Sequence, residues 1–83
     1  MFFTYILQSS TSGRFYVGRT DDLDQRLHFH NTGQSHYTAR KGPWVLVHKE
    51  AFTTRSDAAK REMEIKRWKS AVKIRELVST SSQ

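Results

Sequence analysis

The sequence predicts an α+β fold in which a small three-stranded antiparallel sheet is flanked by helices, in the order β-β-α-β-α(-α). Two short runs rich in aromatic and β-branched residues, Met1–Leu7 and Phe15–Gly18, flank a loop rich in Ser and Gly, which is typical of a β-hairpin. A third such run, Trp44–His48, lies between two segments with helical periodicity. With 83 residues and no cysteine, the chain has room for one domain, residues 1–83, whose core must hold by packing alone.

The hairpin loop determines which residues of the first two strands face each other. If the loop, residues 9–13, is symmetric about its centre, Tyr5 lies directly opposite Tyr16. We therefore expect the two phenols on one face of the sheet as a cross-strand pair, whereas a bulge at the loop glycine would shift this register.

The first helix is predicted over Asp21–Asn31. Thr20 can cap its N-terminus, three aspartates in its first turn suit the positive end of the helix dipole, and Gly33 ends it. Arg26 and His30 are four residues apart, so their side chains point the same way, at the border of the apolar stripe. Each has an ordinary explanation, an ion pair with an aspartate one turn earlier or a contact with the helix dipole. Each also has a functional one, phosphate binding or proton transfer.

A long helical segment is predicted over Arg55–Val78, after the third strand. Thr54 begins it in a capping-box pattern, and Ser70 can divide it into two helices. We expect the last residues, 79–83, to form a frayed tail. The residues predicted to face the core are Ala58, Ala59, Met63, Ile65, Trp68, Val72 and Leu77.

Glu62 lies at the edge of the apolar stripe of this segment, where a carboxylate needs a partner. One candidate partner is Lys66, which is four residues further along the helix. The other is a hard divalent cation, for which carboxylate oxygens are suitable ligands. Helix geometry alone leaves both alternatives open.

The chain is strongly basic, with 14 Lys and Arg against 8 Asp and Glu and a formal net charge of +6. Such a surplus attracts polyanions, so nucleic acid is the expected partner. No apolar run approaches the roughly 20 residues of a membrane helix, and the start of the chain lacks the basic segment of a signal peptide. We therefore expect a cytoplasmic protein without a membrane partner. The motifs of phosphate-binding loops, serine hydrolases and zinc proteases do not occur.

Two tyrosine motifs, an Arg-x-x-x-His pair and a helical glutamate follow one another in order. The motifs Phe3–Tyr5 and Tyr16–Gly18 place their tyrosines eleven residues apart. Arg26 and His30 come next, and Glu62 stands in the pattern Glu-x-x-Ile-Lys. Over nearly the whole chain this set resembles the GIY-YIG nuclease superfamily, specifically its small stand-alone members related to the amino-terminal domain of excinuclease C. The first motif keeps only its tyrosine, since phenylalanine and threonine replace glycine and isoleucine.

The resemblance implies a Mg²⁺-dependent endonuclease in which water attacks a phosphodiester in line. Glu62 would hold the single metal ion, which Mn²⁺ could replace, and Arg26 would bind the developing phosphorane. Tyr5 and Tyr16 would position or deprotonate the water, and either could be the base. His30 would relay a proton or contact a phosphate.

Further basic residues are expected to contact the phosphate backbone. Arg19 lies three residues after the second tyrosine and would contact phosphate or lower the pKa of a tyrosine. Residues 36–38, before the basic loop, are expected to line the groove. The other predicted nucleic-acid-binding residues are Arg40, Lys41, Lys60, Arg61, Lys66, Arg67, Lys69 and Lys73.

We expect cleavage directed by the structure of DNA, in repair or recombination, because the resemblance leaves no segment of this chain for a sequence-recognition domain. RNA is an open alternative substrate. A non-catalytic nucleic-acid-binding module of the same fold is the alternative function. The protein is expected to be a monomer or a weak dimer that could act within a larger repair complex.

Overall fold

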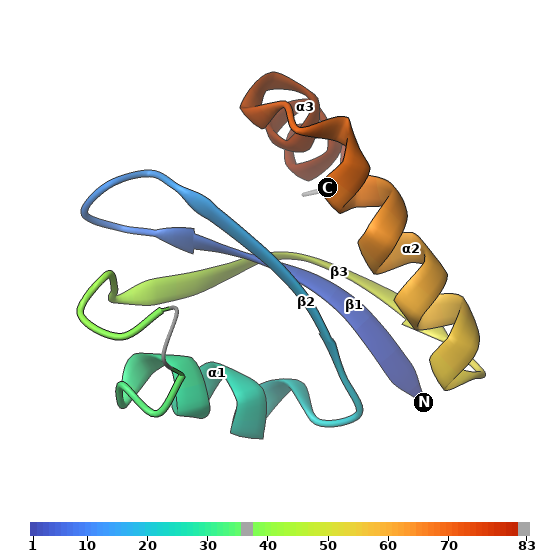
Figure 1. The fold of residues 1–83 in the computed structure, drawn as a ribbon, viewed down its shortest axis with the longest axis horizontal. Coiled ribbons are helices and arrows are strands. Elements are labelled where there is room, and N and C mark those ends of the chain that lie inside the picture. The colour runs from blue at the N-terminus through green and yellow to red at the C-terminus, as the bar shows by residue number, and fades with distance from the viewer. Residues whose placement is uncertain (36–37, 82–83) are drawn as a thin grey trace.

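The computed structural model of the chain describes residues 1–35 and 38–81 (Figure 1). The strands are β1 (Phe2–Ser9), β2 (Phe15–Thr20) and β3 (Trp44–Phe52), and they form an antiparallel sheet in the spatial order β2-β1-β3. The helices are α1 (Leu23–Asn31), α2 (Arg55–Trp68) and α3 (Ala71–Ser81). This architecture confirms the predicted fold class and order of elements, including the division of the long segment at Ser70. Within the described residues, every helix is too short or too polar to span a bilayer.

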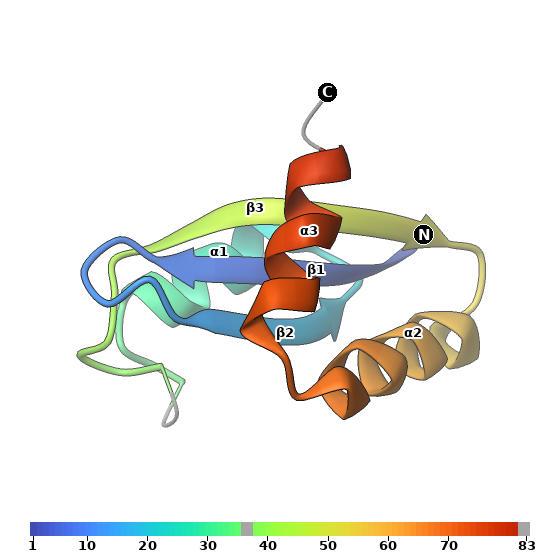
Figure 2. The same cartoon turned by 90° about the horizontal axis from the view of Figure 1, so that it is seen from above.

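Both faces of the sheet are covered by helices, α1 on one side and α2 with α3 on the other (Figure 1). Figure 2 shows α3 crossing over the strands. Successive residues of β1 point to opposite faces, so the central strand contributes to two hydrophobic clusters. The buried residues of the cluster under α1 are Tyr5, Leu7 and Trp44. Those of the cluster under α2 and α3 are Ile6, Val17 and Ile65.

The register of the β1–β2 hairpin differs from the symmetric prediction, which was wrong. Tyr5 pairs with Gly18 instead of Tyr16. The reason is the loop, which closes with a hydrogen bond from Ser9 N–H to the carbonyl of Arg14 (2.9 Å), so its centre lies one residue further along the chain. A shift of two residues preserves the facing of side chains. The two tyrosines therefore still share a face, as diagonal neighbours with ring centroids 6.4 Å apart.

Several element boundaries also differ from the prediction. α1 begins two residues later, because Asp22, not Thr20, is the N-cap and accepts the N–H of Gln25 (3.0 Å). β3 extends to residue 52, four residues beyond its predicted end, since it pairs with β1 along its whole length. α3 continues to residue 81, so the predicted frayed tail is helical over residues 79–81, and residues 82–83 lie outside the described part.

The start and the break of the long helical segment follow the prediction. Thr54 Oγ1 accepts the N–H of Asp57 (3.1 Å) at the N-terminus of α2. Lys69, with φ of +49°, ends α2 in the left-handed conformation just before Ser70. The two helices that result cross the sheet in different directions (Figure 2).

Two residues predicted to face the core do not. Met63 and Val72 are 51% and 60% exposed, so their assignment to the core was wrong. The buried stripe of α2 runs through Ala58, Glu62 and Ile65, and Met63 lies about 100° from the middle of that stripe. The stripe is narrow because α2 rests on the sheet along one side only.

Candidate active site

A cavity of about 280 Å³ opens over β1 and β2, between α1 and α2. It is lined by residues from both helices, both strands and the turn that follows β2. The predicted site residues on its wall are Tyr5, Tyr16, Arg19, Arg26 and Glu62. The fold thus brings together residues that are 57 positions apart in the sequence, at the place where the two helices approach the sheet from opposite faces.

Tyr5 is linked by hydrogen bonds to His30 and Thr38. The distance from Tyr5 Oη to His30 Nε2 is 3.0 Å, and that from His30 Nδ1 to Thr38 Oγ1 is 2.8 Å. All three residues are buried. Trp44 Nε1 donates to the Thr38 carbonyl (3.1 Å), which fixes the far end of the chain of hydrogen bonds. The sequence resemblance points to the first two residues, whereas Thr38 follows the undescribed residues 36–37 and had no assigned role beyond the predicted groove.

Burial determines the protonation of this pair. It raises the pKa of the Tyr5 phenol, and the nearby Tyr16 and Glu62 add to the rise against the opposing effect of Arg26. Burial, together with the charge of Arg26, lowers the pKa of the His30 imidazole. Near pH 7 the phenol is therefore protonated and the imidazole neutral. We assign the phenol O–H as the donor to Nε2, and Nδ1–H as the donor to Thr38.

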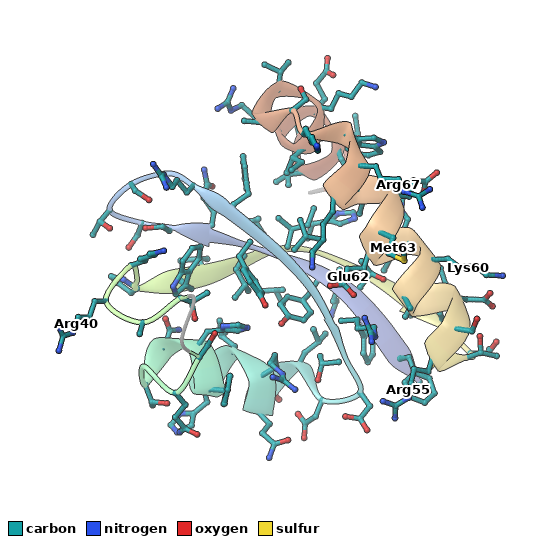
Figure 3. The ribbon with its side chains drawn as sticks, in the orientation of Figure 1. Arg40, Arg55, Lys60, Glu62, Met63 and Arg67 are labelled. Carbon is teal, nitrogen blue, oxygen red and sulfur yellow. The ribbon has the colours of Figure 1, made fainter. Side chains whose placement is uncertain are left out.

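Glu62 is a buried carboxylate, 7% exposed, that faces the sheet from the middle of α2 (Figure 3). Its Oε2 accepts from Lys66 Nζ (2.6 Å), so the intrahelical pair considered from the sequence is present. Its Oε1 accepts from Arg19 Nη1 (2.7 Å), a partner that helix geometry did not indicate. The side chains of Arg19 and Lys66 are about half exposed, so both can move into solvent when a ligand approaches the carboxylate.

Arg26 reaches the cavity from α1 without a carboxylate partner among the described residues. Asp22, the partner considered from the sequence, accepts the N–H of Gln25 as the helix cap. The Arg26 guanidinium instead stacks over the Phe29 ring, with Cζ 4.9 Å from the ring centroid. Stacking uses the face of the guanidinium, so its N–H donors stay available for an anion.

Comparison with known proteins identifies the family of this chain. A profile of the GIY-YIG catalytic domain matches residues 1–75. The chain belongs to the GIY-YIG family. UPF0213 proteins of Staphylococcus aureus strains Mu50 and N315 are each 40% identical to it over 74 residues, 88% of this chain and 89% of the relative. The solution NMR structure of a UPF0213 protein from Bacillus halodurans superposes with a TM-score of 0.62 at 36% identity, covering 99% of this chain and 87% of that one.

The resemblance inferred from the tyrosine motifs is thereby confirmed. GIY-YIG domains are the catalytic domains of nucleases, so the substrate class of the family is nucleic acid. The change of the first motif to Phe-Thr-Tyr retains the tyrosine whose phenol lines the cavity. The relatives are small proteins of similar length, which agrees with the predicted stand-alone type.

The structure separates the other predicted nucleic-acid-binding residues. Figure 3 shows Lys60 and Arg67 pointing from α2 away from the sheet, and Arg40 in the loop at the opposite end of the molecule from Arg55. Lys66 and Lys69 border a second, more apolar hollow beside Phe15. Lys41 adjoins Arg40, and the described members of this loop precede β3. These residues form several patches and not one continuous surface with the cavity.

Arg61 is engaged in ion pairs and is not free for phosphate binding. Its Nε and Nη2 donate to the two carboxylate oxygens of Glu50 (2.9 and 3.1 Å), and its Nη1 donates to Glu64. His48 Nε2 lies 2.7 Å from the same Glu50 carboxylate. Lys73 Nζ lies 5.9 Å from the Trp68 ring centroid, and the Arg61 guanidinium lies 5.6 Å from it. Arg61 therefore fastens α2 to β3.

Asn31 and Gly18 support the site, although neither was predicted as a site residue. The Asn31 amide accepts from the N–H of Trp44 (2.7 Å) and donates to its carbonyl (3.0 Å), which joins α1 to β3. Gly18 provides the space for the Tyr5 phenol, because a Cβ there would lie 2.5 Å from Oη and 2.7 Å from Cζ.

Replacing Gly18 by alanine is expected to lower the rate of nucleic-acid cleavage by about 10²-fold, because the Tyr5 phenol must move away from His30. The overpacked contact should also lower the free energy of unfolding by about 1–3 kcal/mol. Single-turnover cleavage and urea unfolding would measure the two effects. Gly33→Ala is the control: nothing lies near its Cβ, but its φ of +77° strains alanine, so it should lose stability and keep its rate. A Gly18→Ala variant with the wild-type rate would contradict this role.

Proposed function

We propose that this protein is a Mg²⁺-dependent endonuclease that hydrolyses DNA phosphodiester bonds, directed by DNA structure, in repair or recombination in the cytoplasm. The observation that carries the proposal is the cavity that joins the buried Tyr5–His30 pair, the unpaired Arg26 guanidinium and the Glu62 carboxylate. Activation of water, stabilisation of a charged phosphate and binding of a cation need these three kinds of group. Residues 1–83 act as one catalytic domain, as a monomer or a weak dimer.

Water activation is assigned to Tyr5 and His30 acting together. Because the pKa of Tyr5 is raised, its phenolate is too rare near pH 7 to serve as the base by itself. As the attacking water gives its proton to Tyr5 Oη, the phenol proton passes to Nε2 of the neutral His30, and the imidazolium that forms keeps its hydrogen bond to Thr38. Tyr16, whose ring centroid is 4.7 Å from that of His30, borders the cavity and orients the water.

The phosphate is held by arginine. The Arg26 guanidinium is planar and permanently charged, so it can donate two parallel N–H bonds to phosphate oxygens and bind them more strongly as charge develops. Arg19 adds positive charge beside Glu62. These groups contact the backbone and not base edges, which supports recognition of DNA shape over sequence.

The residues of the cavity fit a Mg²⁺ ion. Within the described part of the chain, no three His, Asp or Glu side chains gather as a metal-binding group, so a closed zinc-type site is not formed. Mg²⁺ keeps several waters and uses one or two carboxylates with substrate phosphates, and Glu62, with Asp21 also on the cavity wall, supplies that donor set. When bound, the ion would neutralise phosphate charge and stabilise the leaving oxygen.

The test is cleavage of end-labelled single-stranded, duplex, flap and four-way-junction DNA with Mg²⁺, beside matched RNA. We expect cleavage of at least one DNA structure, and loss of cleavage in EDTA. Preference for one branched form would identify the substrate, and preference for RNA would overturn the assignment to DNA. Binding of DNA without cleavage by any of these combinations would favour the non-catalytic module instead.

The rate should depend on the protonation of His30. Since the neutral imidazole accepts the proton and its pKa lies below the ordinary 6.5, kcat/KM is expected to fall only as the pH drops below 6.5. For the same reason, the part of the stability due to His30 is present above pH 6.5 and decreases below it, because the unfolded chain binds the proton more readily. The measurement is a pH profile of cleavage for wild type, His30→Gln and His28→Gln.

His28→Gln is a matched control, since His28 is an exposed histidine of the same helix. It should keep both the rate and the acid limb. His30→Gln should be slower and should lose the limb. An unchanged acid limb in His30→Gln would show that another group accepts the proton.

A further inference from the structure

Arg55 is a third arginine on the wall of the catalytic cavity, besides Arg19 and Arg26. It lies in the first turn of α2, and Ala58 and Glu62 follow at three and seven residues. This spacing puts all three on one side of the helix, with Arg55 about 10 Å from Glu62 along the axis. Figure 3 shows Arg55 at the N-terminal end of α2, beside the start of β1.

No carboxylate among the described residues pairs with the Arg55 guanidinium. Instead it stacks over the Phe2 ring, with Cζ 5.1 Å from the ring centroid. A stacked guanidinium keeps its in-plane N–H donors free. The position is electrostatically unfavourable for a cation, because the first turn of a helix carries the positive end of the dipole. An unpaired arginine in this place is well suited to an anion.

The arrangement of Arg55 matches that of Arg26 on the other side of the cavity. Each guanidinium stacks on a phenylalanine of its surroundings, each lines the cavity, and neither is taken up by an ion pair. Arg61, further along α2, is the opposite case, since two carboxylates occupy its donors. The ion pairs of Arg61 and the freedom of Arg55 thus divide these two arginines of α2 by function.

We propose that Arg55 forms a second phosphate subsite, which holds a phosphate that flanks the scissile one. The inference rests on the proposed nuclease function for the identity of the anion. Arg26 then acts on the reacting phosphate and Arg55 on a neighbour in the same strand, which fixes the register of the strand over Glu62. Arg55 is a positioning residue, because it does not touch the reacting atoms.

The experiment compares Arg55→Ala, Arg55→Lys and Arg75→Ala with wild type. Arg75 is an exposed arginine on α3, away from the cavity, and provides an equal loss of charge. Binding of fluorescein-labelled flap, duplex and single-stranded DNA is followed by anisotropy in EDTA over a series of salt concentrations. Cleavage of the same DNAs with Mg²⁺ gives kcat and KM, and circular dichroism melting checks the fold.

Arg55→Ala is expected to raise Kd and KM by about tenfold, with kcat within about twofold of wild type. The log–log salt slope on duplex DNA should become shallower by about 0.9, the value for one lost phosphate contact. Arg55→Lys should recover the slope, since it restores the charge, and part of the affinity. Arg75→Ala should leave Kd and slope nearly unchanged.

A wild-type Kd and slope in Arg55→Ala, or effects equal to those of Arg75→Ala, would overturn the subsite. A loss in kcat at unchanged KM would also overturn it, since Arg55 would then act on the chemical step. The binding arm contains no Mg²⁺, so it tests Arg55 even if wild type cleaves none of the DNAs. Failure of the nuclease function is thereby distinguishable from failure of the subsite.

Discussion

Replacing Glu62 by alanine is expected to lower the rate of DNA cleavage by at least about 10³-fold, because binding of the metal ion contributes several kcal/mol to the transition state. DNA affinity should stay within about threefold of wild type or increase, because the interaction lost acts on the chemical step. Arg19 and Lys66 also lose their shared anion and become free to contact the DNA backbone. Single-turnover cleavage and anisotropy in EDTA measure the two quantities.

Glu62→Gln separates the charge of this side chain from its volume. It keeps the shape of a buried side chain but cannot hold Mg²⁺ with the same strength, so it should be as slow as Glu62→Ala. Glu64→Gln is the matched control, since Glu64 is an exposed glutamate of the same helix that faces Arg61. Turnover of Glu62→Ala at the wild-type rate would refute the metal-binding role, and loss of DNA binding would point to a structural one.

Replacing Arg26 by alanine is the second change for which we expect a large effect, a fall in kcat of about 10²- to 10³-fold. The guanidinium is stacked on Phe29 and unpaired, so it is already oriented for the charge that develops on the phosphate. KM should change by less than about threefold, since most of this interaction forms in the transition state. Arg26→Lys keeps the charge without the planar pair of donors and should recover only part of the rate.

The pH profile gives an independent check on Arg26. Its charge lowers the pKa of His30, so removal of the charge should move the acid limb of kcat/KM to higher pH. Arg14→Ala, at the exposed hairpin loop, is the control and should move neither the limb nor kcat. An Arg26→Ala variant that raises KM but keeps kcat would place Arg26 in ground-state binding, against the mechanism proposed above.

Local patterns predicted which segments fold into which elements, and they failed where a boundary depends on a competing contact. Thr20 and Asp22 are both good caps, and only the hydrogen bond to Gln25 in the folded turn selects Asp22. The register of the hairpin likewise depends on how its loop closes. Tyr5 and Tyr16 nonetheless share a face under either register, because side chains alternate with a period of two.

The candidate site was predictable as a set of residues but not as a network. Tyrosine motifs, the Arg-x-x-x-His pair and the helical glutamate identified the family from their order. Arg55 had a signal too, since it lies on the same side of its helix as Glu62, seven residues earlier. Thr38 had none that set it apart from other loop residues, because its contact with His30 depends on the path of the loop between α1 and β3.

The sequence by itself determined the fold class, the order of the elements and the family, since these depend on local periodicity and on the order of a few residue types. Only the tertiary structure decided which charges are paired: Glu62 with Arg19 and Lys66, Arg61 with Glu50, and Arg26 and Arg55 with neither acid. Pairing of charges depends on distances of a few ångströms between distant segments, because the Coulomb energy and the strength of a hydrogen bond fall off over that range. That pairing distinguishes the arginines that hold the fold together from those available for phosphate.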